Sequence, residues 1–149
     1  MSEIEIVNRE MEPDELDQMY QGFDQHTGEQ GVELQSSDRF SYTAVIKNRF
    51  VGCVSGLAYK NGDKYSGWFY LTDLFVEKAY RRQGLGVKLL NTLEQKLMLI
   101  GITDCWTWTA GYEAPSFYQK QGYEIFAELE CWYSDGSNRV ALRKKIRLQ

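Results

Sequence analysis

The chain has 149 residues, of which 43% are hydrophobic and 26% charged, and its formal net charge is −4. This composition excludes a disordered tail and fits a single globular domain over residues 1–149. A chain of net negative charge lacks the basic surface of a duplex binder, so we expect no nucleic acid partner, and it is suited to attract cationic substrates.

The N-terminal segment predicts one strand, one helix and an arm. Residues 4–7 alternate apolar and charged side chains, as in a strand. A helix begins at Pro13, with acidic residues in its first turn and apolar residues at helical spacing as far as Phe23. Residues 25–39 are polar and include two glycines, which favours a flexible arm with at most a short helix.

Three strand-like runs follow and predict an antiparallel meander. They cover residues 42–46, 50–59 and 68–76. Asn61-Gly62 between the second and third run is a strong hairpin signal. The sheet should therefore grow by short turns between neighbouring strands.

The second half of the chain alternates helices and strands. Residues 84–100 place leucines along one helical face, and Gly101 marks the end of that helix. A strand over 102–109, a short helix over 115–121 and two strands over 123–133 and 139–146 should follow. A strand after a crossover helix runs parallel to the strand before it, so 102–109 should pair with 68–76. The fold class is therefore mixed α/β, with one central crossover helix.

Cysteine and histidine usage limits the metal and redox chemistry. Cys53, Cys105 and Cys131 are odd in number, far apart and in no CxxC pair, which predicts free thiols in a reducing compartment. With His26 as the single histidine, we expect no metal site and no Cys–His nucleophile. The acidic start of the chain lacks a signal sequence, and no apolar run approaches the roughly 20 residues that cross a bilayer. We expect a cytoplasmic protein with no membrane partner.

The turn after the third run has the features of an anion site. The first N–H groups of a helix lack intrahelical partners and carry positive dipole charge, which suits a phosphate. Gly84 and Gly86 remove side chains from this turn, while Arg81 and Arg82 add cations. Taken alone, the string fits a solvated basic loop equally well. It lacks the third glycine of a dinucleotide fingerprint and the Gly-Lys-Ser/Thr of an ATP-type loop.

Two motifs make the chain resemble the GNAT superfamily of acyl-CoA-dependent N-acetyltransferases. The central signature of that family is Arg/Gln-x-x-Gly-x-Gly/Ala after a strand ending hydrophobic-x-Val. Arg81, Gly84 and Gly86 match it, after Leu74-Phe75-Val76. A second family pattern, Ala-x-x-Phe-Tyr and then Gly-aromatic, is matched by Ala114-Pro115-Ser116-Phe117-Tyr118 and Gly122-Tyr123. The resemblance covers nearly the whole chain. It implies a mostly antiparallel sheet of six or seven strands with a central crossover helix and flanking helices.

The resemblance also implies roles for residues. The backbone of Leu74, Phe75 and Val76 would pair with the pantetheine amides of acetyl-CoA. The turn and the helix start would bind its phosphates, through Arg81, Arg82, Gln83, Gly84, Leu85, Gly86 and Val87. Phe117 and Tyr118 would contact the cofactor near its sulfur. Tyr118 would protonate the leaving thiolate while the amine attacks directly, without a covalent enzyme intermediate.

The proton acceptor is open at this point. Asp73 lies near where relatives such as spermidine/spermine acetyltransferases carry a catalytic acid, so it is a candidate base or amine anchor. A structural carboxylate is the alternative, and Glu113 and Glu130 are further candidates. Relatives often carry Asn where this chain has Gly111. One branch, loosely described as histone acetyltransferase-like, also lacks this Asn, and its C-terminal half looks much like residues 122–129.

The functional hypothesis is acetyl transfer from acetyl-CoA to a primary amine of a small molecule, peptide or protein. The alternative is an acyl-CoA-binding sensor or interaction module without turnover. A homodimer is compatible with both, and a domain that serves dimerisation through its C-terminal strands is a third reading. The sequence does not name the acceptor amine.

Overall fold

The computed structural model describes residues 3–113 and 115–147, which divide into two compact units between Leu34 and Gln35. The first unit contains one helix, α1 (Pro13–Glu29). Its first turn is fixed by Glu15, whose carboxylate accepts a hydrogen bond from the Glu12 N–H at 2.8 Å and pairs with Arg9 at 2.7 Å. These contacts complement the unpaired N–H groups and the positive dipole charge of the helix start.

Two expectations for the N-terminal segment were wrong. Residues 4–7 form no strand, because no strand in the described part of the chain pairs with them, and Ile4 and Ile6 are each 94% exposed. Of the arm expected over 25–39, residues 25–29 belong to α1 and residues 35–39 to the first strand, and only residues 30–34 lie between them without regular structure. In the last turns of α1, Thr27 Oγ1 donates to the Phe23 carbonyl oxygen at 3.0 Å.

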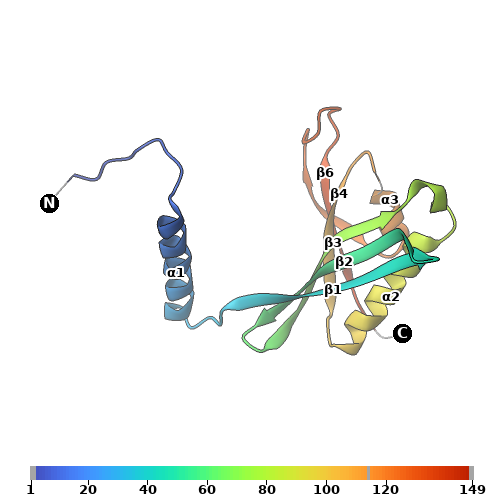
Figure 1. Ribbon diagram of the computed structural model, residues 1–149, viewed down its shortest axis with the longest axis horizontal. Coiled ribbons are helices and arrows are strands. Elements are labelled where there is room, and N and C mark those ends of the chain that lie inside the picture. The colour runs from blue at the N-terminus through green and yellow to red at the C-terminus, as the bar shows by residue number, and fades with distance from the viewer. Residues whose placement is uncertain (1–2, 114, 148–149) are drawn as a thin grey trace. The chain divides into compact units, whose positions relative to one another are not determined.

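The second unit is a six-stranded sheet in the order β1-β2-β3-β4-β6-β5, with helices packed on it (Figure 1). The strands are β1 (Gln35–Ile46), β2 (Arg49–Asn61), β3 (Lys64–Val76), β4 (Asp104–Ala110), β5 (Glu124–Leu129) and β6 (Arg139–Lys145). Only β3 and β4 run parallel, and the other neighbours are antiparallel. The mixed α/β class, the six strands and the parallel crossover pair are therefore confirmed.

The first three strands are longer than predicted. Pairing of β1 with β2 extends as far as Gln35 opposite Asn61, where the side chains are polar and give no apolar alternation. Both hairpin turns use left-handed residues, Lys47 and Asn48 (φ 49° and 65°) in the first and Gly62 (φ 59°) in the second. Such tight turns match the twist of the strands and fix their register.

Three helical segments connect and cover the strands: η1 (Lys78–Tyr80), α2 (Leu85–Leu99) and α3 (Pro115–Lys120). The buried face of α2 carries Leu89, Leu90, Leu93 and Leu97, which pack against β2 and β3. Gly101 ends α2 in a left-handed conformation (φ 85°), and the Ile102 N–H bonds the Leu97 carbonyl oxygen at 2.9 Å. No helix within the described ranges has the length and apolar character needed to cross a membrane.

The fifth strand is shorter than the predicted 123–133. It ends at Leu129, because Cys131 is left-handed (φ 52°) and the Trp132 and Tyr133 N–H groups both bond the Ser137 carbonyl oxygen. The chain therefore turns back before β6, and residues 130–138 form a loop at the end of these two strands.

Candidate active site

The central strands β3 and β4 pair at their beginning and then separate. Their parallel pairing covers three positions and ends at Tyr70 opposite Trp106. The Thr107 hydroxyl makes a last link, to the Leu71 carbonyl oxygen at 2.9 Å. From residue 72 to 76, β3 has no strand partner on the β4 side within the described residues. This stretch includes Leu74, Phe75 and Val76, and its open edge can accept an extended chain as an added strand.

The turn that follows β3 presents free backbone N–H groups. Arg82 and Gly84 are both left-handed (φ 63° and 80°), and Gly84 is the N-cap of α2 with no side chain to satisfy the helix start. The first helical bond joins the Lys88 N–H to the Gly84 carbonyl oxygen at 3.0 Å. The N–H groups of Leu85, Gly86 and Val87 are therefore the unpaired donors of the first turn.

Arg81 ties this turn to the end of β3, and Gly86 lies close to Phe117 and Val76. Arg81 donates from Nε to the Val76 carbonyl oxygen at 2.9 Å, which ties the turn to the end of β3, and its guanidinium remains exposed. A Cβ at Gly86 would lie 3.5 Å from the Phe117 ring and 3.8 Å from Val76 Cγ2. These are ordinary contacts, so Gly86 borders space that Phe117 and Val76 enclose. Gln83 is exposed beside it.

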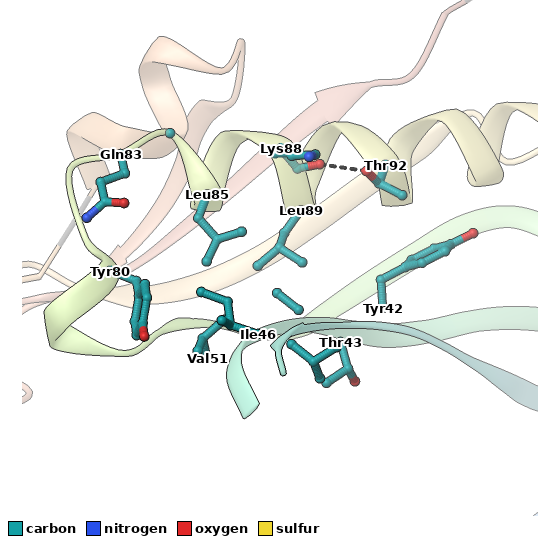
Figure 2. A pocket seen from close by; sticks show the side chains of 13 residues that line it. Tyr42, Thr43, Ile46, Val51, Tyr80, Gln83, Leu85, Lys88, Leu89 and Thr92 are labelled. Atoms are coloured by element: carbon teal, nitrogen blue, oxygen red, sulfur yellow. Dashed lines mark hydrogen bonds between the residues drawn. The ribbon is translucent and has the colours of Figure 1, made fainter. Parts of the chain in front are cut away.

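A cavity of about 520 Å³ adjoins the same turn on its β1 side (Figure 2). Leu85 and Leu89 of α2 point into it toward Val51 and Ile46, and Tyr80 and Gln83 lie at one end. It also includes Gly84 and Lys88 but not Asp73 or Tyr118. It therefore flanks the candidate phosphate turn and not the candidate reaction centre.

Tyr118 lies on α3 in the buried core. It is 8% exposed and packs edge to face against Phe117 and Tyr123, with ring centroids 5.4 and 5.5 Å away. Burial, with the neighbouring Cys105 thiol adding to it, raises the pKa of the Tyr118 phenol to about 12. The phenol therefore keeps its proton at neutral pH and is able to donate a hydrogen bond.

Asp73 lies on β3 at the point where that strand separates from β4. Its side chain is exposed, and Oδ2 lies 2.8 Å from the Thr72 hydroxyl. No hydrogen bond joins Asp73 to Tyr118 among the residues described. The two candidates therefore belong to different environments, one exposed and one buried.

The remaining candidates are less well placed. Glu113 and Glu130 are exposed, and His26 is exposed on α1 in the first unit. Ala114 lies outside the described residues. Within the described ranges no three His, Cys, Asp or Glu side chains gather to hold a metal ion.

Gly111 stands where the family often has Asn, and the structure gives a reason. Its N–H bonds the Asn138 carbonyl oxygen at 2.7 Å, and a Cβ at this position would lie 3.0 Å from that same oxygen. Any larger residue would push back the loop before β6. Gly111 and Asn138 lie far apart in sequence, as do Thr107 and Leu71. For this reason, neither the Asn138 contact nor the hydrogen bond from Thr107 to Leu71 was found from sequence. The one available signal for Thr107 was the alternation of Cys105, Thr107 and Thr109 along β4.

Comparison with known proteins settles the family. The profile of the acetyltransferase (GNAT) domain matches residues 37–125. The chain belongs to the GNAT acetyltransferase family. The two sequence motifs predicted this membership, which is confirmed.

Individual relatives are distant. The catalytic subunit NAA20 of the N-terminal acetyltransferase B complex from Arabidopsis thaliana is 29% identical over 102 residues. That match covers 66% of this chain and 58% of the relative, so the chain spans little more than half of that protein. A crystal structure of an acetyltransferase from Bacillus cereus ATCC 14579 has a TM-score of 0.76 at 18% identity, over 94% of this chain and 97% of that one.

An aminoglycoside 6′-N-acetyltransferase complexed with coenzyme A has a TM-score of 0.61 at 22% identity, over 74% of each chain. At such identities the solved structures show the shared fold, a mostly antiparallel sheet with flanking helices.

Proposed function

We propose that this GNAT enzyme transfers the acetyl group of acetyl-CoA to a primary amine of a small molecule, peptide or protein by direct attack. The observation that carries the proposal is the conjunction of an open strand edge with an uncapped helix start. The β3 edge ends at Val76, and the free N–H groups begin at Leu85. Arg81 bonds Val76 and links the two features.

These residues fit the two halves of acetyl-CoA. The backbone of Leu74, Phe75 and Val76 offers donors and acceptors to the pantetheine amides. The N–H groups of residues 85–87 suit the pyrophosphate, because they combine free donors with positive dipole charge. Arg81 and Arg82 add charge-assisted hydrogen bonds. When bound, acetyl-CoA supplies an acetyl group activated as a thioester.

Direct attack is supported by the state of the buried cysteine. A covalent cysteine intermediate needs a thiolate, and burial raises the pKa of the Cys105 thiol to about 12, so this thiol stays protonated. Burial also raises the pKa of the Cys53 thiol. The amine nitrogen therefore bonds to the carbonyl carbon as the carbon–sulfur bond breaks. We assign Asp73 to attract the substrate ammonium and pass its proton to water. Tyr118 donates a hydrogen bond to the departing sulfur.

A series of substitutions at the turn tests the cofactor assignment. Gly86→Glu places a carboxylate beside the free N–H groups and should weaken acetyl-CoA binding at least tenfold, because charge-assisted contacts of about 1.5–3 kcal/mol are lost. Gly86→Ala should bind normally, since its Cβ makes only ordinary contacts. Gly28→Glu is the matched control, because it adds the same charge at an open position on α1.

Calorimetric titration with acetyl-CoA measures all three variants and the wild-type chain. Equal affinity of wild type and a folded Gly86→Glu chain would remove the basis of the cofactor assignment. A cytoplasmic location and a homodimer stay predictions.

A further inference from the structure

A hydrogen-bonded cluster of polar side chains crosses the first three strands beside Asp73. Arg39 on β1 donates from Nη1 to Ser55 Oγ on β2 at 2.8 Å and to Thr72 Oγ1 on β3 at 3.0 Å. The Thr72 hydroxyl also lies 2.8 Å from Asp73 Oδ2 and 3.1 Å from the Ser55 carbonyl oxygen. Arg39 and Asp73 are both exposed. The Arg39 guanidinium and the Asp73 carboxylate are therefore both hydrogen-bonded to the Thr72 hydroxyl, and both are open to solvent.

Arg39 and Asp73 do not neutralise each other. The ion pairs of the described residues join other partners, and none joins these two. Because the bonds to Thr72 measure 3.0 and 2.8 Å, Nη1 and Oδ2 lie less than about 6 Å apart. A guanidinium has five N–H donors in a planar fork, so most of its capacity remains for a second, bidentate partner. The pair matches a ligand that carries an ammonium and a carboxylate a few bonds apart.

The surroundings favour an anionic group on the acceptor and provide an apolar wall. Residues 35–149 hold 16 Lys and Arg against 11 Asp and Glu, so this unit is positively charged although the chain is not. Tyr70 and Thr72 of β3 are half-buried, whereas Phe69 and Leu71 between and before them are buried in the core, so neither Tyr70 nor Thr72 belongs to the core face. Its ring stacks on Trp106 with centroids 4.3 Å apart. A side chain attached to the zwitterion can lie along this aromatic pair.

We propose that the acceptor is a free α-amino acid, with its ammonium on Asp73 and its carboxylate on Arg39. This inference rests on the acetyl transfer proposed above and names its substrate class. The nitrogen of the amino acid bonds to the acetyl carbon as the carbon–sulfur bond breaks. The proton leaves through Asp73 to water, and the sulfur keeps the electron pair and takes up a proton. The product, an N-acetylamino acid, has no ammonium to hold it on Asp73, which promotes release.

The test compares each amino acid with its own α-carboxamide and with the decarboxylated amine. The wild-type enzyme should prefer the acid by about ten- to hundredfold in kcat/KM, the factor that one charge-assisted contact supplies. Amine basicity does not explain such a preference, because amides of amino acids have less basic amines and react more readily at neutral pH. Arg39→Met should abolish the preference, mainly by raising the KM for the acid.

Arg49→Met is the matched control. It removes the same charge from an exposed position at the start of β2, where no hydrogen bond joins Arg49 to the described side chains, and should keep the preference. A preference that survives in Arg39→Met overturns the inference. So does acetylation of peptides or polyamines but not amino acids, which would leave the proposed acetyl transfer standing. If calorimetry detects no binding of acetyl-CoA, the proposed acetyl transfer and the amino-acid acceptor are both wrong.

Discussion

At the scale of single residues, burial of the Tyr118 phenol limits how it could stabilise the leaving group in the proposed reaction. Its pKa is raised to about 12, whereas a free thiol has a pKa of about 8.5. Full proton transfer from this phenol to a thiolate is therefore uphill by about 5 kcal/mol, at 1.36 kcal/mol for each pKa unit. Tyr118 is better suited to donate a hydrogen bond to the sulfur in the transition state, and water can supply the proton afterwards.

Tyr118→Phe should keep acetyl-CoA affinity and lower kcat by about 10²-fold, the lower end of what a positioned acid contributes. The ring still packs between Phe117 and Tyr123, so only the hydroxyl donor is lost. Because the phenol stays protonated well above neutral pH, kcat of the wild type should show no alkaline decline up to pH 10. Steady-state kinetics of thiol release measures kcat of the variant and the pH dependence of kcat of the wild type. A decline near pH 8 would show that the proton donor is another group.

At the scale of secondary-structure elements, one ion pair joins α2 to β6. Lys144 Nζ lies 2.5 Å from Glu94 Oε1, and the Glu94 side chain is only 7% exposed. Glu94 Oε2 is buried without a hydrogen-bond partner in the described part of the chain. Burial raises the pKa of Glu94 and outweighs the opposing effect of Lys144. Compared with water, the site therefore disfavours the charged carboxylate, and charge on Glu94 costs stability.

Lys144→Met should destabilise the fold by about 3 kcal/mol at pH 7, because it leaves a buried carboxylate without its cation. The folded-state pKa of Glu94 rises further in this variant. Its contribution to stability is then fully present below the unfolded pKa, about 4.3, and is lost as pH rises through the folded pKa. Urea unfolding should give a smaller deficit at pH 4.5 than at pH 7.

Lys145→Met is the control for this pair, since Lys145 is exposed on the same strand, and it should change stability by less than about 0.5 kcal/mol. An equal loss for Lys144→Met at both pH values would assign its effect to packing and not to the buried charge.

The helices and the central strands could be predicted because each has a buried face. Apolar residues therefore recur along the sequence with the period of a helix or a strand. The leucines of α2 gave both bounds of that helix to within one residue. The long β1–β2 hairpin was underestimated because its outer half is polar and exposed, so pairing and turn geometry determine it. The strand expected at residues 4–7 failed for the opposite reason. Its alternation was present, but a strand needs a partner, and sequence alone does not supply one.

The candidate site divides in the same way. The phosphate turn is a local feature, so Arg81, Gly84 and Gly86 could be found from neighbouring residues and a family motif. The Arg39–Thr72–Asp73 cluster depends on the register of three strands across 33 residues of chain. Asn138 beside Gly111 likewise depends on a loop approach. No local pattern encodes these contacts, which is why Asp73 was found without Thr72, to which it is hydrogen-bonded, and without Arg39, which bonds Thr72.

At the scale of the whole molecule, charge is distributed unevenly along the chain. Residues 1–34 hold ten Asp and Glu against one Arg, while residues 35–149 hold 16 basic against 11 acidic residues. The net charge of −4 therefore does not describe the unit that contains the candidate site. Because the acidic excess lies in the N-terminal segment, the net charge gives no support to the expectation that this unit attracts cationic substrates, and that expectation stays untested.

The uneven charge predicts the sign of the salt effect on acetyl-CoA binding. If the net charge of −4 governed the field at the turn, screening would relieve repulsion and added salt would strengthen binding of this anion. If Arg81, Arg82 and the excess of basic residues govern it, salt should weaken binding. Between 0.1 and 1 M salt the Debye length falls from about 10 to about 3 Å, so screening acts strongly on these exposed charges. We expect the Kd, measured by calorimetry, to rise by about three- to tenfold over this range, because exposed cations contribute part of each charge-assisted contact. A Kd that falls with salt would show that the basic residues of the second unit do not govern acetyl-CoA binding.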